Sequence, residues 1–186
     1  MILDPLSFSH GQTQSKIWLC EELEPLLPEN AVVGVLGCWH NLQAFLLASR
    51  KRNTYKSILG ADIDSEAIRG ANTLCQGYMI GDDSLISNVV ADVNTYDFRG
   101  FSAVINASVE HMSNEWFDNL TDSNTIICVQ SSTVAIAEEP WFISNPSTTF
   151  AEFEAKFPMS EILYSGSKRF DYGTLCYDRM MLIGKK

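Results

Sequence analysis

Residues 31–41 of the chain read AVVGVLGCWHN. Residues 31–37 are apolar or glycine and rich in valine, which is typical of a short strand buried on both faces of a parallel sheet. Gly37 ends this run, and an amphipathic helix is predicted to follow at about 41–51 (NLQAFLLASRK). A buried strand, a glycine turn and a helix in this order favour an α/β fold.

The same alternation continues on both sides of this unit. A helix at 12–24 precedes the first strand and is stopped by Pro25 and Pro28. Further apolar runs predict strands at 56–62, 88–93, 101–107 and 125–130, with helices between them at 65–75, capped by Ser65, and at 114–120. Strand–helix alternation of this kind favours a mostly parallel sheet with helices on both faces.

The last part of the chain has a different pattern. After an irregular polar stretch at 131–150, the sequence predicts a helix at 148–156 and strands at 160–166 and about 174–183, with their turn near 168–173. Two closing strands with little between them predict an antiparallel hairpin at one edge of the sheet. We expect one domain over residues 1–186, with an N-terminal helical segment at 1–30.

Ligands of open α/β sheets bind beyond the carboxyl ends of the strands, so polar residues at these ends are the first candidates for a site. Gly37 would let the backbone approach a ligand closely. Asp62 ends the second strand and would accept hydrogen bonds from the ribose hydroxyls of an adenosine; the alternative is a helix-capping or surface acid. Asp64 is a rival for the ribose and is better explained as a cap of the turn into the next helix.

The third and fourth strands also end in polar residues. Asp92 would accept a hydrogen bond from an adenine amino group, or it is a surface acid at a strand end. Residues 106–112 (NASVEHM) directly follow an apolar strand. Within them His111, next to Glu110, would act as a general base on an acceptor oxygen or nitrogen. The alternative is that Glu110 caps the next helix while His111 packs under it.

Four segments together carry a family resemblance, and they are VLGC (35–38), GADIDSEAI (60–68), VVADV (89–93) and VINASVEHM (104–112). Their order and spacing resemble the motif series of class I S-adenosylmethionine (SAM)-dependent methyltransferases over about residues 31–130. The GxW of the first loop and the EHM segment are similar to those of small phage-encoded members of this group.

The resemblance implies a Rossmann-like three-layer αβα sandwich with a mostly parallel seven-stranded sheet. Its C-terminal antiparallel hairpin separates this version from ordinary dinucleotide-binding folds. The resemblance also implies methyl transfer with SAM as the cofactor. It implies cofactor contacts from Gly37, Cys38, Trp39, His40, Asp62, Ile63, Asp92, Val93, Asn106 and Ala107, and catalytic roles for Glu110 and His111. For Trp39 and His40 the alternative is a core tryptophan beside a satisfied loop histidine.

The chain departs from the family pattern in its first motif. Val35 stands where an acid is usual, and Trp39 and Asn41 stand where the second and third glycines are usual. No Asn/Asp-Pro-Pro-aromatic segment follows the fourth strand, so methylation of a nucleobase amino group is not supported. Two alternatives therefore stay open. One is a non-catalytic SAM-binding or structural partner protein; the other is an NAD-dependent oxidoreductase, against which the missing GxGxxG and the closing hairpin speak.

Composition limits the class of partner and compartment. The formal net charge is -10, and an acidic surface repels phosphate backbones, so a small molecule or a protein is favoured as acceptor over free nucleic acid. The one basic run, at 49–56, is explained as a solvated helix end. The N-terminus lacks the basic n-region of a signal peptide, and no apolar run approaches the ~20 residues of a membrane span. We expect a cytoplasmic protein with no membrane segment.

The remaining candidates concern metals, thiols and the acceptor. The sequence has no HExxH and no His/Asp/Glu set with metal spacing, so no metal site is expected. The cysteines are odd in number and without a CxxC pair, which predicts buried free thiols rather than a disulfide set. Residues 131–147 would form the acceptor-side wall, with Ser131, Ser132, Trp141 and Phe142 facing the substrate; the alternatives are turn residues and packing onto the domain.

Overall fold

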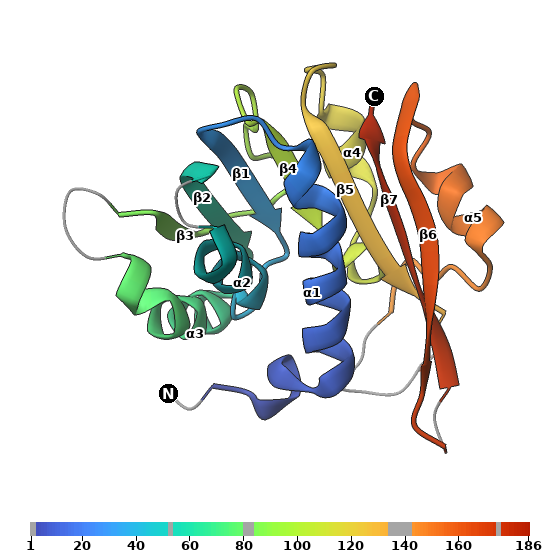
Figure 1. The fold of residues 1–186 in the computed structure, drawn as a ribbon, viewed down its shortest axis with the longest axis horizontal. Helices are drawn as coiled ribbons and strands as arrows, with labels where there is room; N and C mark the ends of the chain where they lie inside the picture. The colour runs from blue at the N-terminus through green and yellow to red at the C-terminus, as the bar shows by residue number, and fades with distance from the viewer. Residues whose placement is uncertain (1–2, 52–53, 80–83, 134–142, 174–175) are drawn as a thin grey trace.

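The structure is a computed structural model that describes residues 3–51, 54–79, 84–133, 143–173 and 176–186. Within these ranges seven strands form a single sheet (Figure 1). The strands are β1 (Ala31–Leu36), β2 (Tyr55–Asp62), β3 (Ile86–Val90), β4 (Ala103–Asn106), β5 (Ile126–Ser132), β6 (Glu161–Asp171) and β7 (Cys176–Lys185). The α-helices are α1 (His10–Leu23), α2 (Leu42–Lys51), α3 (Ser65–Cys75), α4 (Glu115–Asn119) and α5 (Phe150–Lys156); short 3-10 turns include η1 (Pro5–Phe8), η2 (Glu24–Leu26), η4 (Gln76–Tyr78) and η5 (Val109–His111).

The strand order is β3-β2-β1-β4-β5-β7-β6. Strands β1 to β5 pair in parallel, whereas β7 pairs antiparallel with both β5 and β6. This is the predicted mostly parallel sheet with a closing antiparallel hairpin. From β1 the chain first builds the sheet toward β3 and then returns to add β4 on the other side. The order therefore reverses between β1 and β4, where open α/β sheets hold their ligands.

Successive residues of each central strand point to opposite faces of the sheet, and each face has its own apolar core. On β1, Val35 packs into the core beneath α1, α2 and α3, and its neighbour Leu36 packs into the core beneath α4 and α5. On β5, Cys128 and Val129 divide in the same way. Figure 1 shows the two helical layers with the sheet between them. The predicted three-layer αβα sandwich is confirmed.

Aromatic side chains fill the second core. Trp116 and Phe117 of α4 both contact Phe157, which directly follows α5, and Phe157 contacts Phe153 in the middle of α5, with ring centroids 5.3–6.1 Å apart. All four side chains are fully buried. The short helices α4 and α5 are thus held by this cluster, since helices of five and seven residues have little stability of their own.

Element boundaries differ from the sequence-based expectation at several strand and helix ends. Strand β3 begins at Ile86 rather than residue 88, and β6 extends to Asp171 rather than 166. Apart from the buried Phe170, the end of β6 is polar and exposed, so the sequence there shows no apolar alternation that would mark a strand. The N-cap of α3 is Asp64, whose side chain accepts a hydrogen bond from the Glu66 N–H at 2.8 Å; the expectation for Ser65 was wrong. Across the described ranges, no helix is both long and apolar enough to cross a bilayer.

Candidate active site

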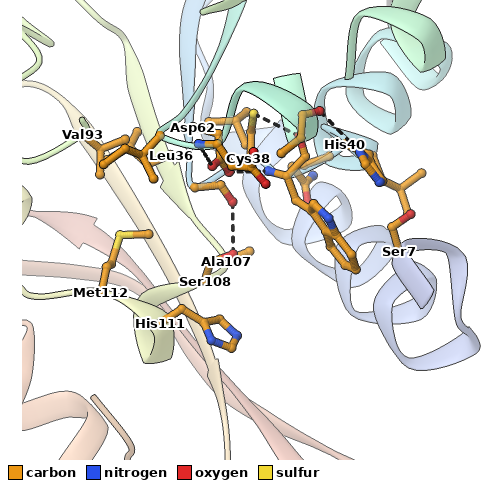
Figure 2. Close-up of a pocket in the computed structure, with 18 of the residues that line it drawn as sticks. Ser7, Leu36, Cys38, His40, Asp62, Val93, Ala107, Ser108, His111 and Met112 are labelled. Carbon is orange, nitrogen blue, oxygen red and sulfur yellow. Dashed lines mark hydrogen bonds between the residues drawn. The ribbon is translucent and has the colours of Figure 1, made fainter. Parts of the chain in front are cut away.

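A cavity of about 500 Å³ opens at the carboxyl ends of β1 to β4, a volume in the range of small-molecule sites (Figure 2). It lies where the strand order reverses. In the described part of the chain, the structure brings all but one of the predicted cofactor-binding and catalytic residues into its lining. These are Gly37, Cys38, Trp39, His40, Asp62, Ile63, Asp92, Val93, Ala107, Glu110 and His111.

The loop after β1 turns sharply into α2. Gly37, Trp39 and Asn41 have φ of 55°, 49° and 53°, so alternate residues adopt the left-handed conformation. A Cβ atom at Gly37 would collide with Met112, and the Gly37 carbonyl accepts a 3.1 Å hydrogen bond from the Ser108 hydroxyl. Only the first of these positions holds a glycine, so contacts elsewhere in the fold stabilise the other two.

Asn41 is held by its side chain. Its Oδ1 accepts a hydrogen bond from the Ala44 N–H in the first turn of α2, and its Nδ2 donates to Asn88 Oδ1 at 2.7 Å. Gly60 leaves the space for this amide pair, because a Cβ there would overlap both side chains. The asparagine in place of a glycine therefore fixes the loop by hydrogen bonds rather than by freedom of the backbone.

Asp62 joins the end of β2 to this loop. Its Oδ2 accepts a hydrogen bond from the Trp39 N–H at 2.8 Å, and its Oδ1 accepts one from the Asp64 N–H at 3.0 Å. Each carboxylate oxygen keeps a lone pair for a further donor. Asp62 is half-buried and lines the cavity, so it is not simply a surface acid. Asp64 lines the cavity and caps α3, as expected for the rival candidate.

Trp39 and His40 form a stacked pair, with ring centroids 5.3 Å apart and planes 23° from parallel. His40 is 6% exposed. Its Nε2 accepts a hydrogen bond from the Asp4 N–H, which leaves the proton on Nδ1, 3.3 Å from the Ala67 carbonyl. His40 therefore has both ring nitrogens satisfied while also lining the cavity, which combines the two interpretations of the sequence.

The residues after β2 and β3 form an open side of the cavity. Ile63 is 73% exposed although it is a large apolar residue, and Val93 is buried beside Asp92. The Asp92 side chain is exposed and accepts a 2.9 Å hydrogen bond from the Asn94 N–H. In Figure 2, Val93 and Met112 lie on the left of the view, and Ser7 and His40 lie on the right.

Asn106 is the predicted residue that does not line the cavity. It is fully buried, its Oδ1 accepts a 3.0 Å hydrogen bond from the Ser108 N–H, and its Nδ2 lies 3.1 Å from Met112 Sδ. The side chain thus shapes the turn after β4 from beneath.

Glu110 and His111 line the cavity in different environments. Glu110 is 5% exposed, and its Oε1 lies 3.7 Å from Arg179 Nη1 on β7; Arg179 is 6% exposed. The alternatives from the sequence are both wrong. Glu110 pairs with Arg179 rather than capping α4, which has no side-chain cap, and His111 is exposed rather than packed under a helix.

Helix α1 supplies cavity residues that the sequence did not indicate. Gln12 and Lys16 line the cavity from α1, and Ser7 lines it from η1. Burial and the nearby Arg179 lower the pKa of Lys16 to about 7, against smaller opposing effects of Glu110 and Cys20. No local pattern marks Lys16, because its place depends on how α1 packs across the face of the sheet, with its N-terminal turns at the cavity.

The acceptor-side wall is described only in part. Ser131 and Ser132 are buried inside β5 and are neither turn residues nor part of the cavity lining. Trp141 and Phe142 lie outside the described residues. Among the described residues, Ser131 Oγ has no hydrogen-bond partner.

Four of the five cysteine thiols are buried, which disfavours their ionisation. Cys20, Cys38, Cys75 and Cys128 are buried, as expected, and Cys176 is exposed. Burial raises the pKa of Cys20 and of Cys75 to about 12, and raises that of Cys38 well above its usual value. Cys38 therefore lines the cavity as a protonated thiol, without the thiolate that a nucleophile requires.

Comparison with solved structures identifies the fold. Magnesium protoporphyrin IX methyltransferase (ChlM) from Synechocystis PCC 6803, solved with bound SAM, is 13% identical, with a TM-score of 0.63 over 94% of this chain and 80% of that chain. N-methyltransferase NodS from Bradyrhizobium japonicum WM9 is 13% identical, with a TM-score of 0.65 over 95% and 96%. TrmK from M. capricolum, solved with S-adenosylhomocysteine (SAH), is 12% identical, with a TM-score of 0.57 over 89% and 67%.

No family model and no curated protein matches the sequence. The similarity to the solved structures shows that the chain has the Rossmann-like α/β fold seen in class I SAM-dependent methyltransferases, as the motif series predicted.

Proposed function

We propose that this chain is an enzyme that binds SAM in the cavity and transfers its methyl group to a small-molecule or protein acceptor. The observation that carries the proposal is the position of Asp62. A half-buried carboxylate ends β2, lines the cavity beside the Gly37 turn and keeps acceptor capacity on both oxygens. A ribose offers two adjacent hydroxyl donors, which such a carboxylate would accept.

The neighbouring residues suit the rest of an adenosine. The exposed apolar side chain of Ile63 follows Asp62 directly, and Val93 lies on the same open side of the cavity. A planar base between apolar side chains would be removed from water, and the Asp92 carboxylate would accept a hydrogen bond from its amino group. The turn from Gly37 to His40 would then hold the amino-acid part of the cofactor.

The charge of the lining favours a sulfonium over a dinucleotide. The described lining residues include one lysine, Lys16, and four carboxylates. The carboxylates belong to Asp62, Asp64, Asp92 and Glu110. A positively charged sulfonium is attracted to this lining, whereas a pyrophosphate would be repelled by it. This supports SAM over NAD, in agreement with the lack of a GxGxxG motif. Two of the solved structures named above hold SAM or SAH, which also supports the proposal.

When bound, SAM would supply an electrophilic methyl group on sulfur. The protein's part is to align the acceptor with that methyl group and to exclude water, which lowers the barrier by several kcal/mol. Gly37, Trp39 and His40 would orient the cofactor, since their loop is fixed by Asp62 and Asn41. Glu110 and His111 lie at the η5 side of the cavity, where they would contact the acceptor.

A second candidate is a non-catalytic SAM-binding partner protein. Trp39 favours it, because its ring occupies part of the cavity lining at a position where the family usually has a glycine. Both candidates require cofactor binding, and they differ in turnover.

Calorimetry with SAH tests the proposal, with NADH as the matched control ligand. We expect a dissociation constant in the micromolar range for SAH and no measurable heat with NADH. A folded protein that binds NADH but not SAH would contradict the proposal. If SAH binds, incubation with SAM and a cell extract separates the two candidates. Conversion of SAM to SAH above the protein-free rate is expected of an enzyme, and intact SAM is expected of a binding protein.

A further inference from the structure

Lys16 stands apart from the other charged groups of the cavity. Among the described lining residues it is the one lysine or arginine, and it comes from α1 rather than from a strand end. Its charged neighbours are Glu110, after β4, and Arg179, on β7. Because β7 adjoins β5, this places Lys16 toward the β5 side of the sheet, whereas Asp62 and Asp92 follow β2 and β3 on the other side.

Among the described residues, the neighbours of the Lys16 amine include no carboxylate that pairs with it alone. Glu110 is already paired with Arg179, and both side chains are nearly fully buried. On α1, the Lys16 Nζ donates a hydrogen bond to Gln12 Oε1, a neutral acceptor, and the nearby Cys20 is a protonated thiol. A partly buried ammonium beside a buried guanidinium is disfavoured, so the neutral amine has a substantial population near pH 7.

A neutral amine in a methyl-transfer cavity has a chemical use. When an N–H or O–H acceptor is methylated, its lone pair forms the bond to the methyl carbon, the carbon–sulfur bond electrons return to sulfur, and one proton must leave the acceptor. We propose that the Lys16 amine takes this proton. The lone pair of Nζ binds it, and the resulting ammonium releases it to solvent after the methylated product has left. This inference rests on the proposed function.

The two residues predicted as catalytic from the sequence are less suited to this step. Glu110 is tied to Arg179, and moving it to the acceptor would leave a buried guanidinium unpaired. His111 is exposed to water. In this arrangement the Glu110–Arg179 pair acts as a positioning element for Lys16. Burial is the main effect that disfavours the charged form of the amine; Arg179 disfavours it further, and Glu110 favours it.

The alternative role for Lys16 is an ion pair with the carboxylate of the bound cofactor. The two roles differ in protonation. An amine that pairs with a carboxylate is charged and takes up a proton when the cofactor binds, and its removal weakens binding. An amine on the acceptor side stays neutral with the cofactor in place.

The test measures the reactivity of each lysine with acetic anhydride as a function of pH, by peptide mass spectrometry, with and without saturating SAH. Only the neutral amine reacts. We expect a midpoint near pH 7 for Lys16 in both states, against about 10 for ordinary surface lysines in the same sample. A midpoint of about 9 or above in either state would overturn the proposal. Two neighbours provide opposite controls: Arg179→Met is expected to raise the Lys16 midpoint, and Glu110→Gln to lower it.

A second measurement uses calorimetry of SAH binding at pH 7 in buffers of different ionisation enthalpy. We expect the heat to be independent of the buffer, and Lys16→Met to bind SAH within about threefold of the unchanged protein. Proton uptake on binding that disappears in Lys16→Met, or a loss of affinity of about thirtyfold or more, would assign Lys16 to the cofactor carboxylate and overturn the proposal. If the unchanged protein does not bind SAH, the proposed function itself is overturned. The pH midpoint of Lys16 reactivity, measured without SAH, distinguishes this failure from a failure of the Lys16 proposal.

Discussion

The Oδ2 atom of Asp62 accepts a hydrogen bond from the backbone N–H of Trp39 across 2.8 Å. This contact fastens the loop after β1 to the end of β2, at the point where the sheet opens into the cavity. One carboxylate therefore both shapes the loop and presents its remaining lone pairs to the cavity. A backbone N–H held this way also stabilises the left-handed conformation of Trp39.

Replacing Asp62 by alanine removes both functions. We expect Asp62→Ala to weaken SAH binding by about 10- to 100-fold, since a hydrogen bond to a charged group contributes about 1.5–3 kcal/mol. Calorimetry measures the affinity, and thermal unfolding measures the loss of the loop contact. Asp122→Ala is the matched control, because Asp122 accepts a backbone N–H from Asn124 far from the cavity. Equal SAH affinity in Asp62→Ala and the unchanged protein would refute the ribose assignment.

Two variants of Asn41 distinguish the contribution of its hydrogen bonds to stability from the cost of its positive φ. Asn41→Ala loses the bonds to Ala44 and Asn88 and keeps a Cβ at positive φ, so we expect a decrease of about 2–3 kcal/mol in the free energy of unfolding. Asn41→Gly loses the same bonds but relaxes the backbone, and it is expected to recover about 1 kcal/mol. Urea unfolding measures both. If the two variants were equally stable, the positive φ would carry no cost.

Gly70 makes room for His40, because a Cβ atom at Gly70 would overlap the imidazole ring. We expect Gly70→Ala to displace His40 from the Ala67 carbonyl, to disturb its stack on Trp39 and to weaken SAH binding by about tenfold or more. Gly77→Ala is the matched control, since nothing lies within 4 Å of the added atom. Binding is measured by calorimetry, and similar affinities for the two variants would count against a role of His40 in the cavity.

The buried Glu110–Arg179 pair predicts strong coupling between two residues far apart in the sequence. Arg179→Met leaves the Glu110 carboxylate buried and unpaired, and we expect a loss of about 3–5 kcal/mol in the free energy of unfolding. The double variant Glu110→Gln, Arg179→Met removes both charges and is expected to be more stable than Arg179→Met alone. A double-mutant cycle from urea unfolding measures the coupling, and additive effects would mean that the pair does not interact.

Lys16 makes stability depend on pH in a defined window. Its pKa is about 7 in the folded protein and about 10.4 in an unfolded chain, so between these values the unfolded chain binds more protons. The free energy of unfolding therefore rises with pH across this window, by at most about 1.4 kcal/mol per pH unit. Above about pH 9 the buried thiols act in the opposite direction, because they stay protonated only in the fold.

The measurement is urea unfolding at pH 6.5, 7.5 and 8.5 for the unchanged protein and for Lys16→Met. The rise is expected in the unchanged protein, and its difference from Lys16→Met isolates the lysine because the other groups are shared. Parallel pH curves for the two proteins would show that Lys16 titrates normally.

Much of the fold could be predicted because the relevant signals are local. The valine-rich strand at 31–36 and the glycine turn are contiguous in sequence, and Asp62 and Asp92 lie at or just after the ends of β2 and β3. Each core strand alternates between two apolar faces, so its burial appears directly in its composition. Asp62 and Asp92 were found at the cavity for this reason.

The unpredicted features depend on contacts between distant segments. Lys16 lines the cavity because α1 packs across the face of the sheet with its N-terminal turns at the cavity, and the partner of Glu110 is on β7. Asn106 was expected at the cavity because it ends β4, but the residue directly at a strand end can point beneath the turn, and here it holds Ser108 and Met112. The sequence spacing of residues predicts which of them lie at the carboxyl edge of the sheet, but it does not predict where their side chains point.

The position of β7 between β5 and β6 has a consequence for the growing chain. Residues 126–132 are buried in the finished sheet, between β4 and β7, yet β7 is the last of the seven strands in the sequence. During synthesis, the edge of β5 that later pairs with β7 stays unpaired until about fifty more residues have left the ribosome. Strands of other chains can add to such an unpaired edge. The nascent protein is therefore most exposed to aggregation in the interval before β7 emerges, and chaperone binding should concentrate at β5 in that interval.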